Sequence, residues 1–124
     1  MTPEYDSNNV FAKILRKEIP CDKVFENDNV LAFRDIHPKR KIHIVIIPKK
    51  PYCDLNDFVA GASETEIVAL MRAPAEIAKE LKFDAEGYRI ISNCGYNGGQ
   101  EVPHLHIHLL AGERIGELVG KPVS

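Results

Sequence analysis

Apolar and polar positions repeat along this chain with two different periods, and each period predicts a kind of element. A helix is predicted to begin after Asn9, a residue type that caps helix N-termini, and to run through VFAKILRKE. Pro20 then prevents its continuation. The predicted apolar stripe of this helix consists of Val10, Ile14 and Leu15.

Two β-rich runs follow the first helix. KVFE and VLAFRD are joined by the Asn-Asp-Asn of residues 27–29, which tolerates the backbone angles of a tight turn, so the pair predicts a hairpin. The next run, residues 42–47, is almost continuously apolar up to Pro48. Such a run is typical of a strand that is covered on both faces, and His43 lies inside it.

The main helix is predicted to begin at Ser63. Ser63 and Glu66 have the Ser-x-x-Glu spacing of a capping box, and apolar residues continue at helical spacing as far as Leu81. Pro74 interrupts this pattern, so we expect a kink or a break into two pieces near residues 71–73.

The last two strands are predicted in YRIIS and VPHLHIHLL, which are separated by the loop NCGYNGGQE. The pattern therefore predicts an α+β fold with a five-stranded antiparallel sheet and two main helices. At 124 residues the chain suits one domain, for which we expect residues 9–117, with a flexible tail at residues 1–8 and a flexible or partner-bound tail at residues 118–124.

Composition narrows the class of partner. The formal net charge of -2 gives no basic field for nucleic acid or an anionic membrane, and no apolar run approaches the length of a membrane span. The N-terminus lacks the pattern of a secretory signal, so we expect a cytoplasmic protein. Three widely spaced cysteines predict neither a disulfide framework nor a CxxC site.

Three of the five histidines stand at alternate positions in the last predicted strand: His104, His106 and His108. Strand side chains alternate between faces, so all three are predicted on one face. Each imidazole needs partners for its ring nitrogens, and packing alone explains such a row poorly. One interpretation is a zinc site, for which the nearby candidates for a further ligand are His43 and Glu101.

The other interpretation is a histidine nucleophile that attacks phosphorus. The loop before the strand carries Gly98 and Gly99, whose backbone N–H groups can approach phosphate oxygens closely. Asn93 and Gln100 add neutral side-chain donors. An imidazole keeps a free lone pair at neutral pH, so it can attack phosphorus itself. This interpretation therefore requires no metal or other cofactor.

These residues resemble a known family. NCGYNGGQEVPHLHIHLLAGE is similar to the signature of the histidine triad (HIT) superfamily, in which three histidines alternate with apolar residues. FAKILRKEIP, LAFRDIHP and IHIVIIPKK match, in order, the stretches that line the nucleotide pocket in this family. The resemblance is greatest to the small histidine triad nucleotide-binding proteins, and it implies a homodimeric purine nucleoside phosphoramidase that binds a purine nucleotide of the AMP or GMP class.

The branch rests on two features. The uridylyltransferase branch has Gln where this chain has His108, which favours hydrolysis over transfer to a sugar phosphate. The dinucleoside polyphosphate hydrolases tend to continue into Pro-Arg, where this chain has Ala111 and Gly112. A dinucleoside polyphosphate hydrolase, a nucleotide-binding interaction module and a zinc-binding protein remain the alternatives.

The resemblance also implies roles for single residues. His106 is the nucleophile, His104 supports its geometry, and His43 belongs to the same relay, while His108 is our candidate for the general acid. Asp35 matches the acid that binds ribose. The expected contacts to phosphate come from Asn93, Gly99, Gln100 and Glu101. The residues that match the apolar slot for the base are Phe11, Ile14, Ile19, Phe33 and Ile36.

This chain departs from better-known members at three positions. Glu101 stands where some members have Ser, which removes a hydroxyl contact to phosphate but leaves the backbone N–H. Pro103 replaces a common aromatic residue, and Pro51 replaces a histidine. We expect both prolines to alter the side of the pocket that receives the leaving group.

Overall fold

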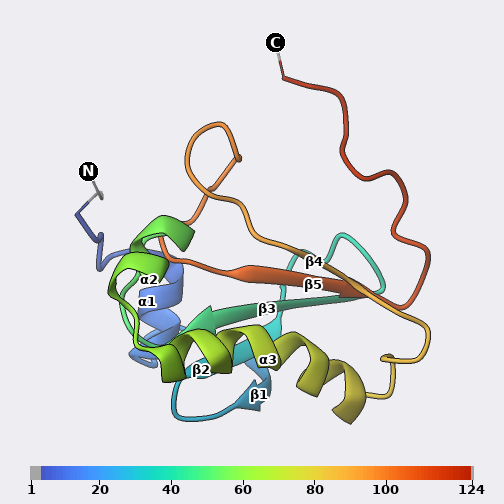
Figure 1. Ribbon diagram of the computed structural model, residues 1–124, viewed down its shortest axis with the longest axis horizontal. Coiled ribbons are helices and arrows are strands. Elements are labelled where there is room, and N and C mark those ends of the chain that lie inside the picture. Colours follow the sequence, from blue (N-terminus) through green and yellow to red (C-terminus); the bar gives the residue numbers. More distant parts are fainter. Residues whose placement is uncertain (1–3, 124) are drawn as a thin grey trace.

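The computed structural model describes residues 4–123, and its centre is an antiparallel sheet of five strands in the order β1-β2-β3-β5-β4 (Figure 1). The strands are β1 (Asp22–Glu26), β2 (Val30–Arg34), β3 (Ile42–Pro48), β4 (Arg89–Ile91) and β5 (Ile107–Ala111). The helices are α1 (Val10–Leu15), α2 (Leu55–Gly61) and α3 (Glu64–Glu80). The predicted α+β class and the five antiparallel strands are confirmed.

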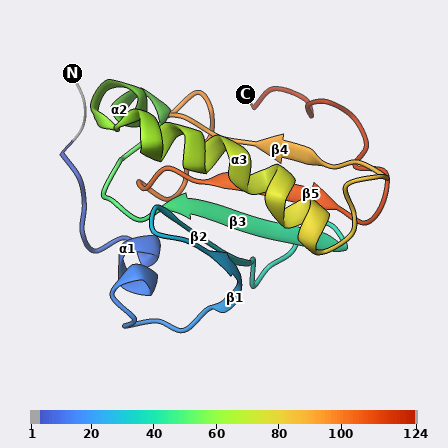
Figure 2. The ribbon, with the colours of Figure 1, turned by 60° about the horizontal axis from the view of Figure 1, so that its bottom comes forward.

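The central strand β3 is buried on both faces, as its continuous apolar run predicted. Side chains alternate along it, so Ile44 and Ile46 join a core under α3, whereas Val45 and Ile47 join a smaller core that contains Phe11 of α1. Figure 2 shows α3 running across the sheet. The two helices therefore cover different faces of the sheet.

The two cores leave the α1 face of β3 and β5 partly open. His43 lies opposite Leu110, and Val45 lies opposite His108, so the two histidines are diagonal neighbours on the same face. Register alone thus brings together two imidazoles that are 65 positions apart in the sequence.

Helix α1 starts as predicted but ends early. The Asn9 side chain accepts a hydrogen bond from the Ala12 N–H, as expected for an N-cap. The helix ends at Leu15 because Lys17 adopts a left-handed backbone conformation (φ 65°), before Pro20 is reached. The predicted stripe is wrong at Val10, which is exposed, because the buried residues of this helix are Phe11 and Ala12.

Helix α3 continues without a break through Pro74, although a break into two pieces was one of the expected outcomes. Proline removes one backbone hydrogen bond, but Pro74 is buried, and its neighbours Ala73 and Ile77 pack in the core. The predicted capping box is present: Ser63 and Glu66 exchange side-chain and backbone hydrogen bonds.

Two features differ from the sequence prediction. Helix α2 was not expected, although Asp54 caps it by accepting a hydrogen bond from the Asp57 N–H. Strand β5 begins only at Ile107, so His104 and His106 precede it. Residues 102–104 form a bend instead of a strand, and the Pro103 ring cannot donate to a ladder.

Contacts are made near both limits of the predicted domain. Tyr5, in the predicted N-terminal tail, reaches His104, and, just inside the C-terminal limit, the Arg89 guanidinium donates to the carbonyls of Gly116 and Glu117. The domain limits themselves stay a prediction, and residues 1–3 and 124 lie outside the described range. None of the helices within residues 4–123 combines the length and apolarity that crossing a membrane requires.

Candidate active site

A cavity of about 500 Å³ opens where α1, the ends of β3 and β5 and the glycine-containing loop meet. This volume lies within the usual range for small-molecule sites. Eight of the predicted site residues line it: Phe11, Asp35, His43, Asn93, Gly99, Glu101, His106 and His108.

His43 and His108 are joined by a hydrogen bond of 2.9 Å between Nε2 of His43 and Nδ1 of His108. The backbone N–H of Lys39 donates to Nδ1 of His43, so a neutral His43 carries its proton on Nε2. That proton is donated to Nδ1 of His108, and a neutral His108 therefore carries its own proton on Nε2. One backbone amide thus fixes the tautomers of two side chains.

Asp35 lies beside this pair. Its Oδ2 is 3.4 Å from Nε2 of His43, and its Oδ1 accepts from the backbone N–H of His37. Burial lowers the pKa of His43 from its usual 6.5, against the opposing effect of Asp35, so His43 is neutral at neutral pH. The contact is therefore between a carboxylate and a neutral ring, and the shorter bond to His108 dominates.

His106 has one ring nitrogen occupied. Its Nδ1 is 2.7 Å from the backbone carbonyl of His104, which can only accept, so Nδ1 carries the proton and Nε2 keeps its lone pair. The rings of Phe11 and His108 pack against His106 edge to face, each with centroids 4.9 Å away. Burial lowers the pKa of His106, so the ring stays neutral.

His104 does not line the cavity. It is fully buried, its Nε2 donates to the Pro48 carbonyl at 2.9 Å, and its Nδ1 lies 2.6 Å from the Tyr5 hydroxyl. Burial, with a smaller contribution from His106, lowers its pKa to about 4. The expectation that all three histidines share one open face therefore fails for His104, because the bend before β5 ends the alternation.

The glycine-containing loop is held by its own side chains. A Cβ on Gly98 would lie 2.4 Å from the Cys94 carbonyl, and Gly99 has φ 74°, so both positions favour glycine. The Asn93 amide donates to the Gly98 carbonyl at 2.6 Å. Gln100 does not line the cavity: it donates to the Cys53 and Val102 carbonyls and accepts from the Gly95 N–H.

Comparison with known proteins gives the family. A sequence model of the HIT domain matches residues 16–115, most of the chain. The chain belongs to the HIT family. A 13.2 kDa HIT-like protein of Azospirillum brasilense is 54% identical over 121 residues, which is 98% of this chain and 99% of that protein. The purine nucleoside phosphoramidase of Escherichia coli K12 is 42% identical over 110 residues, 89% of this chain and 92% of that one.

Solved structures of HIT proteins share the fold. A histidine triad protein from Clostridium difficile has a TM-score of 0.82 at 44% identity, covering 94% of this chain and 100% of that one. A HIT family hydrolase from Legionella pneumophila has a TM-score of 0.82 at 39% identity, covering 91% and 100%. The predicted superfamily is confirmed, and so is the enzyme class at the level of a HIT family hydrolase, since the relatives from Escherichia coli and Legionella pneumophila are a phosphoramidase and a HIT family hydrolase.

The residues expected in the apolar base slot of this HIT protein are only partly together. Phe11 lines the cavity, and Phe33 packs behind it with ring centroids 5.7 Å apart. Ile14 lines a second, smaller cavity, Ile19 is half-buried outside both, and Ile36 is 84% exposed.

Five further residues line the same cavity of about 500 Å³ but were not predicted: His37, Lys39, Ile91, Val102 and Leu110. Leu110 follows His108 by two positions in β5, so strand alternation could have identified it. His37 and Lys39 lie in the loop between β2 and β3, for which the pattern of apolar residues gave no signal.

The structure brings together a set of possible metal ligands that differs from the zinc site considered from the sequence. Asp35, His43 and His108 offer one ligand atom each, all within 4.8 Å of one another, whereas Glu101 is not part of the group. However, Nε2 of His43 and Nδ1 of His108 already form a hydrogen bond with each other. An ion bound to these two nitrogens would have to replace that hydrogen bond, so this pair of nitrogens suits a relay of neutral imidazoles better.

The buried histidines predict acid sensitivity. A folded-state pKa of about 4 for His104 lies below the unfolded value of 6.5, so its stabilising effect is present above pH 6.5 and is lost as the pH falls towards 4. We expect the free energy of unfolding to fall by about 2 kcal/mol from this residue between pH 7.5 and 5. Urea unfolding of wild type and His104→Gln at pH 7.5 and 5 measures it, and an equal pH dependence in both would contradict it.

Proposed function

We propose that this protein hydrolyses the P–N bond of purine nucleoside 5′-phosphoramidates, of the AMP-NH2 or AMP-lysine type, through a nucleotidyl-histidine on His106. The observation that carries the proposal is the Nδ1–H of His106 held by the His104 carbonyl, which leaves the Nε2 lone pair of a cavity-lining residue. Similarity to the E. coli purine nucleoside phosphoramidase supports the choice of reaction.

The proposed reaction has two steps. Nε2 of His106 attacks the α-phosphorus, the P–N bond breaks, and the leaving amine takes a proton from Nε2 of His108. Water then attacks the phosphorus, the bond to His106 breaks, and the products are the nucleoside monophosphate and the free amine. The attacking water gives a proton back to Nε2 of His108, and the hydrogen bond of 2.9 Å from Nε2–H of His43 to Nδ1 holds the His108 ring in place for both transfers.

Charge on the phosphate oxygens needs preorganised donors. In the proposal these come from the backbone around Gly99 and Glu101 and from the second amide proton of Asn93, whose first proton is used by the Gly98 carbonyl. Gln100 contributes by holding the loop, since its side chain bonds to the backbone at three places.

The nucleoside is assigned to the Asp35 side of the cavity. Asp35 uses one oxygen for the His37 N–H, and its remaining lone pairs are suited to ribose hydroxyls. Phe11 offers an apolar wall for the base. The family resemblance alone assigns four further residues to the proposed base slot: Ile14, Ile19, Phe33 and Ile36.

The test is turnover of an adenosine 5′-phosphoramidate that carries an aromatic or lysine-like amine, with a chelator present. We expect steady release of amine and AMP at a rate that the chelator does not change. Little turnover would reject the phosphoramidase proposal, and dinucleoside polyphosphates would then be the next substrates. Binding of AMP without turnover of either class would favour an interaction module.

Two further parts of the proposal concern the state of the protein. We infer a homodimer from the family resemblance, with sedimentation of a two-chain species as its test. We also infer a cytoplasmic location, which agrees with the absence of a disulfide among the cysteines in the described residues.

A further inference from the structure

Tyr5 makes a contact that neither the motif nor the reaction accounts for. Its hydroxyl lies 2.6 Å from Nδ1 of His104, and the two rings pack edge to face with centroids 5.6 Å apart. Because Nε2 of His104 faces a carbonyl and must carry the proton, Nδ1 of the neutral ring can only accept. Burial raises the pKa of the Tyr5 hydroxyl, so it stays protonated and donates this bond.

His104 connects this contact to the proposed nucleophile. Its ring is fixed at both nitrogens, by Tyr5 on one side and Pro48 on the other, and its own carbonyl accepts the Nδ1–H of His106. The residue lies in the bend before β5, outside the strand ladder, and the N–H of the peptide unit that carries its carbonyl, that of Leu105, donates to the Tyr52 carbonyl at 2.8 Å. The orientation of the His104 carbonyl therefore depends on this one backbone bond together with the contacts of the His104 side chain.

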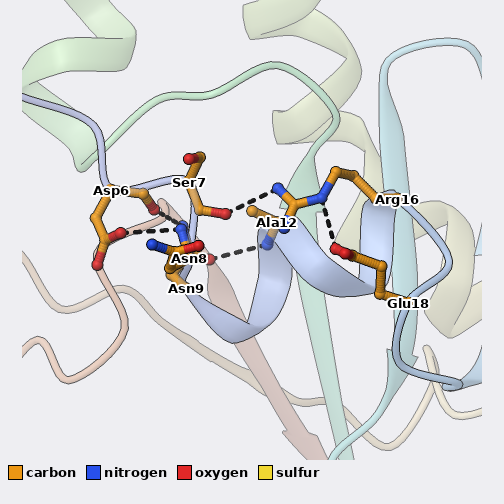
Figure 3. A network of polar contacts seen from close by, with 7 residues as sticks. All are labelled: Asp6, Ser7, Asn8, Asn9, Ala12, Arg16 and Glu18. Carbon is orange, nitrogen blue, oxygen red and sulfur yellow. Dashed lines mark hydrogen bonds and ion pairs between the residues drawn. The ribbon is translucent and has the colours of Figure 1, made fainter.

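The segment that carries Tyr5 is tied to α1. The Asp6 carbonyl accepts from both the backbone and the side-chain amide of Asn9, and the Ser7 carbonyl accepts from Arg16 at 2.8 Å. Arg16 is held in turn by Glu18 at 2.6 Å. Figure 3 shows this network, which bridges residues 6–9 and the end of the helix. The chain just after Tyr5 is thus anchored at several points.

We propose that Tyr5 is a positioning residue that fixes the ring of His104 and, through the His104 carbonyl, the Nδ1–H tautomer of His106. Its kinetic consequence rests on the proposed function, because it concerns the nucleophile of that reaction. The contact itself does not depend on which substrate the protein cleaves.

Loss of the hydroxyl has a defined physical effect. Every buried side-chain nitrogen and oxygen in the described residues has a hydrogen-bond partner. Without the Tyr5 hydroxyl, Nδ1 of the fully buried His104 would lose its donor, which is unfavourable and is relieved by movement of the ring and its backbone. The His104 carbonyl then holds the His106 proton less firmly, so His106 is expected to populate both neutral tautomers.

The experiment compares Tyr5→Phe, which keeps the ring, with Tyr88→Phe as a matched control. Tyr88 packs against Phe83 and does not line the cavity. ¹⁵N spectra of histidine-labelled protein report the tautomer of His106 directly. We expect wild type and Tyr88→Phe to show one Nδ1–H tautomer, and Tyr5→Phe to show nitrogen shifts averaged between the two. For phosphoramidate hydrolysis we expect Tyr5→Phe to lower kcat about tenfold with little change in KM.

Unchanged His106 nitrogen shifts in Tyr5→Phe would overturn the proposal, as would the same averaging in Tyr88→Phe. The spectra decide this point even if the wild type cleaves no phosphoramidate, in which case the proposed function fails separately. A lowered melting temperature with unchanged shifts and kcat would mean that Tyr5 only stabilises the fold, and would also overturn the proposal.

Discussion

His106→Asn is expected to lower kcat/KM for phosphoramidate hydrolysis by about 10⁴-fold, because it removes the only nitrogen assigned to attack phosphorus. Asparagine is chosen because its amide can still donate to the His104 carbonyl, as Nδ1–H of His106 does in the wild type. The variant therefore loses the nucleophilic lone pair while the local hydrogen bond is kept. Single-turnover amine release measures the effect on the first step.

The matched control is His37→Ala, which removes an exposed imidazole from the rim of the same cavity. We expect it to retain activity within a few-fold of wild type. Rapid acid quench followed by mass spectrometry should detect a nucleotidyl adduct on wild type and His37→Ala, and none on His106→Asn. Substantial turnover by His106→Asn would mean that water or another group attacks phosphorus directly.

The regular helices and strands were predictable because the spacing of their apolar residues along the sequence matches the positions that are buried. The apolar run of β3 indicated a strand covered on both faces, and the Ser63–Glu66 spacing indicated the start of α3. Helix α2 has the weakest pattern, since only Phe58 of its residues is buried. Tertiary packing decides such a helix, and local sequence does not.

In the candidate site, too, the sequence pattern predicted residues that follow a regular strand and missed those outside one. Alternation correctly places His106 and His108 by the cavity, because both follow the phase of β5. It fails for His104, which lies in a bend and turns into the core. Tyr5 could not be predicted from the pattern, since it is 99 positions from the ring that it contacts and no periodic signal joins them.

The arrangement explains how four close histidines stay neutral together. Burial lowers the pKa of each one: His43, His104, His106 and His108. Lys39, Pro48 and His104 each supply one backbone group that fixes a tautomer. The fold thus sets which nitrogen holds a proton and which holds a lone pair, and no charged partner is needed for it.

His108 has the second large expected effect, and that effect should depend on the leaving group. Its Nδ1 accepts from His43, so its Nε2–H is the proton available to a leaving amine. Burial, with His106 and His43, lowers its pKa to about 4 in the unliganded protein. A bound phosphate is negative and raises that pKa, which favours proton transfer in the complex.

His108→Asn keeps an acceptor for the Nε2–H of His43 and removes the proton donor. For a phosphoramidate with a strongly basic alkylamine, we expect kcat/KM to fall by about 10²- to 10³-fold, since general acid catalysis contributes effects of this size. For a nucleoside 5′-(nitrophenyl) phosphate, whose nitrophenolate departs as a stable anion, we expect a loss below about tenfold. Comparing both substrates within one variant controls for misfolding. Equal losses would show that His108 acts on phosphate binding instead of on the leaving group.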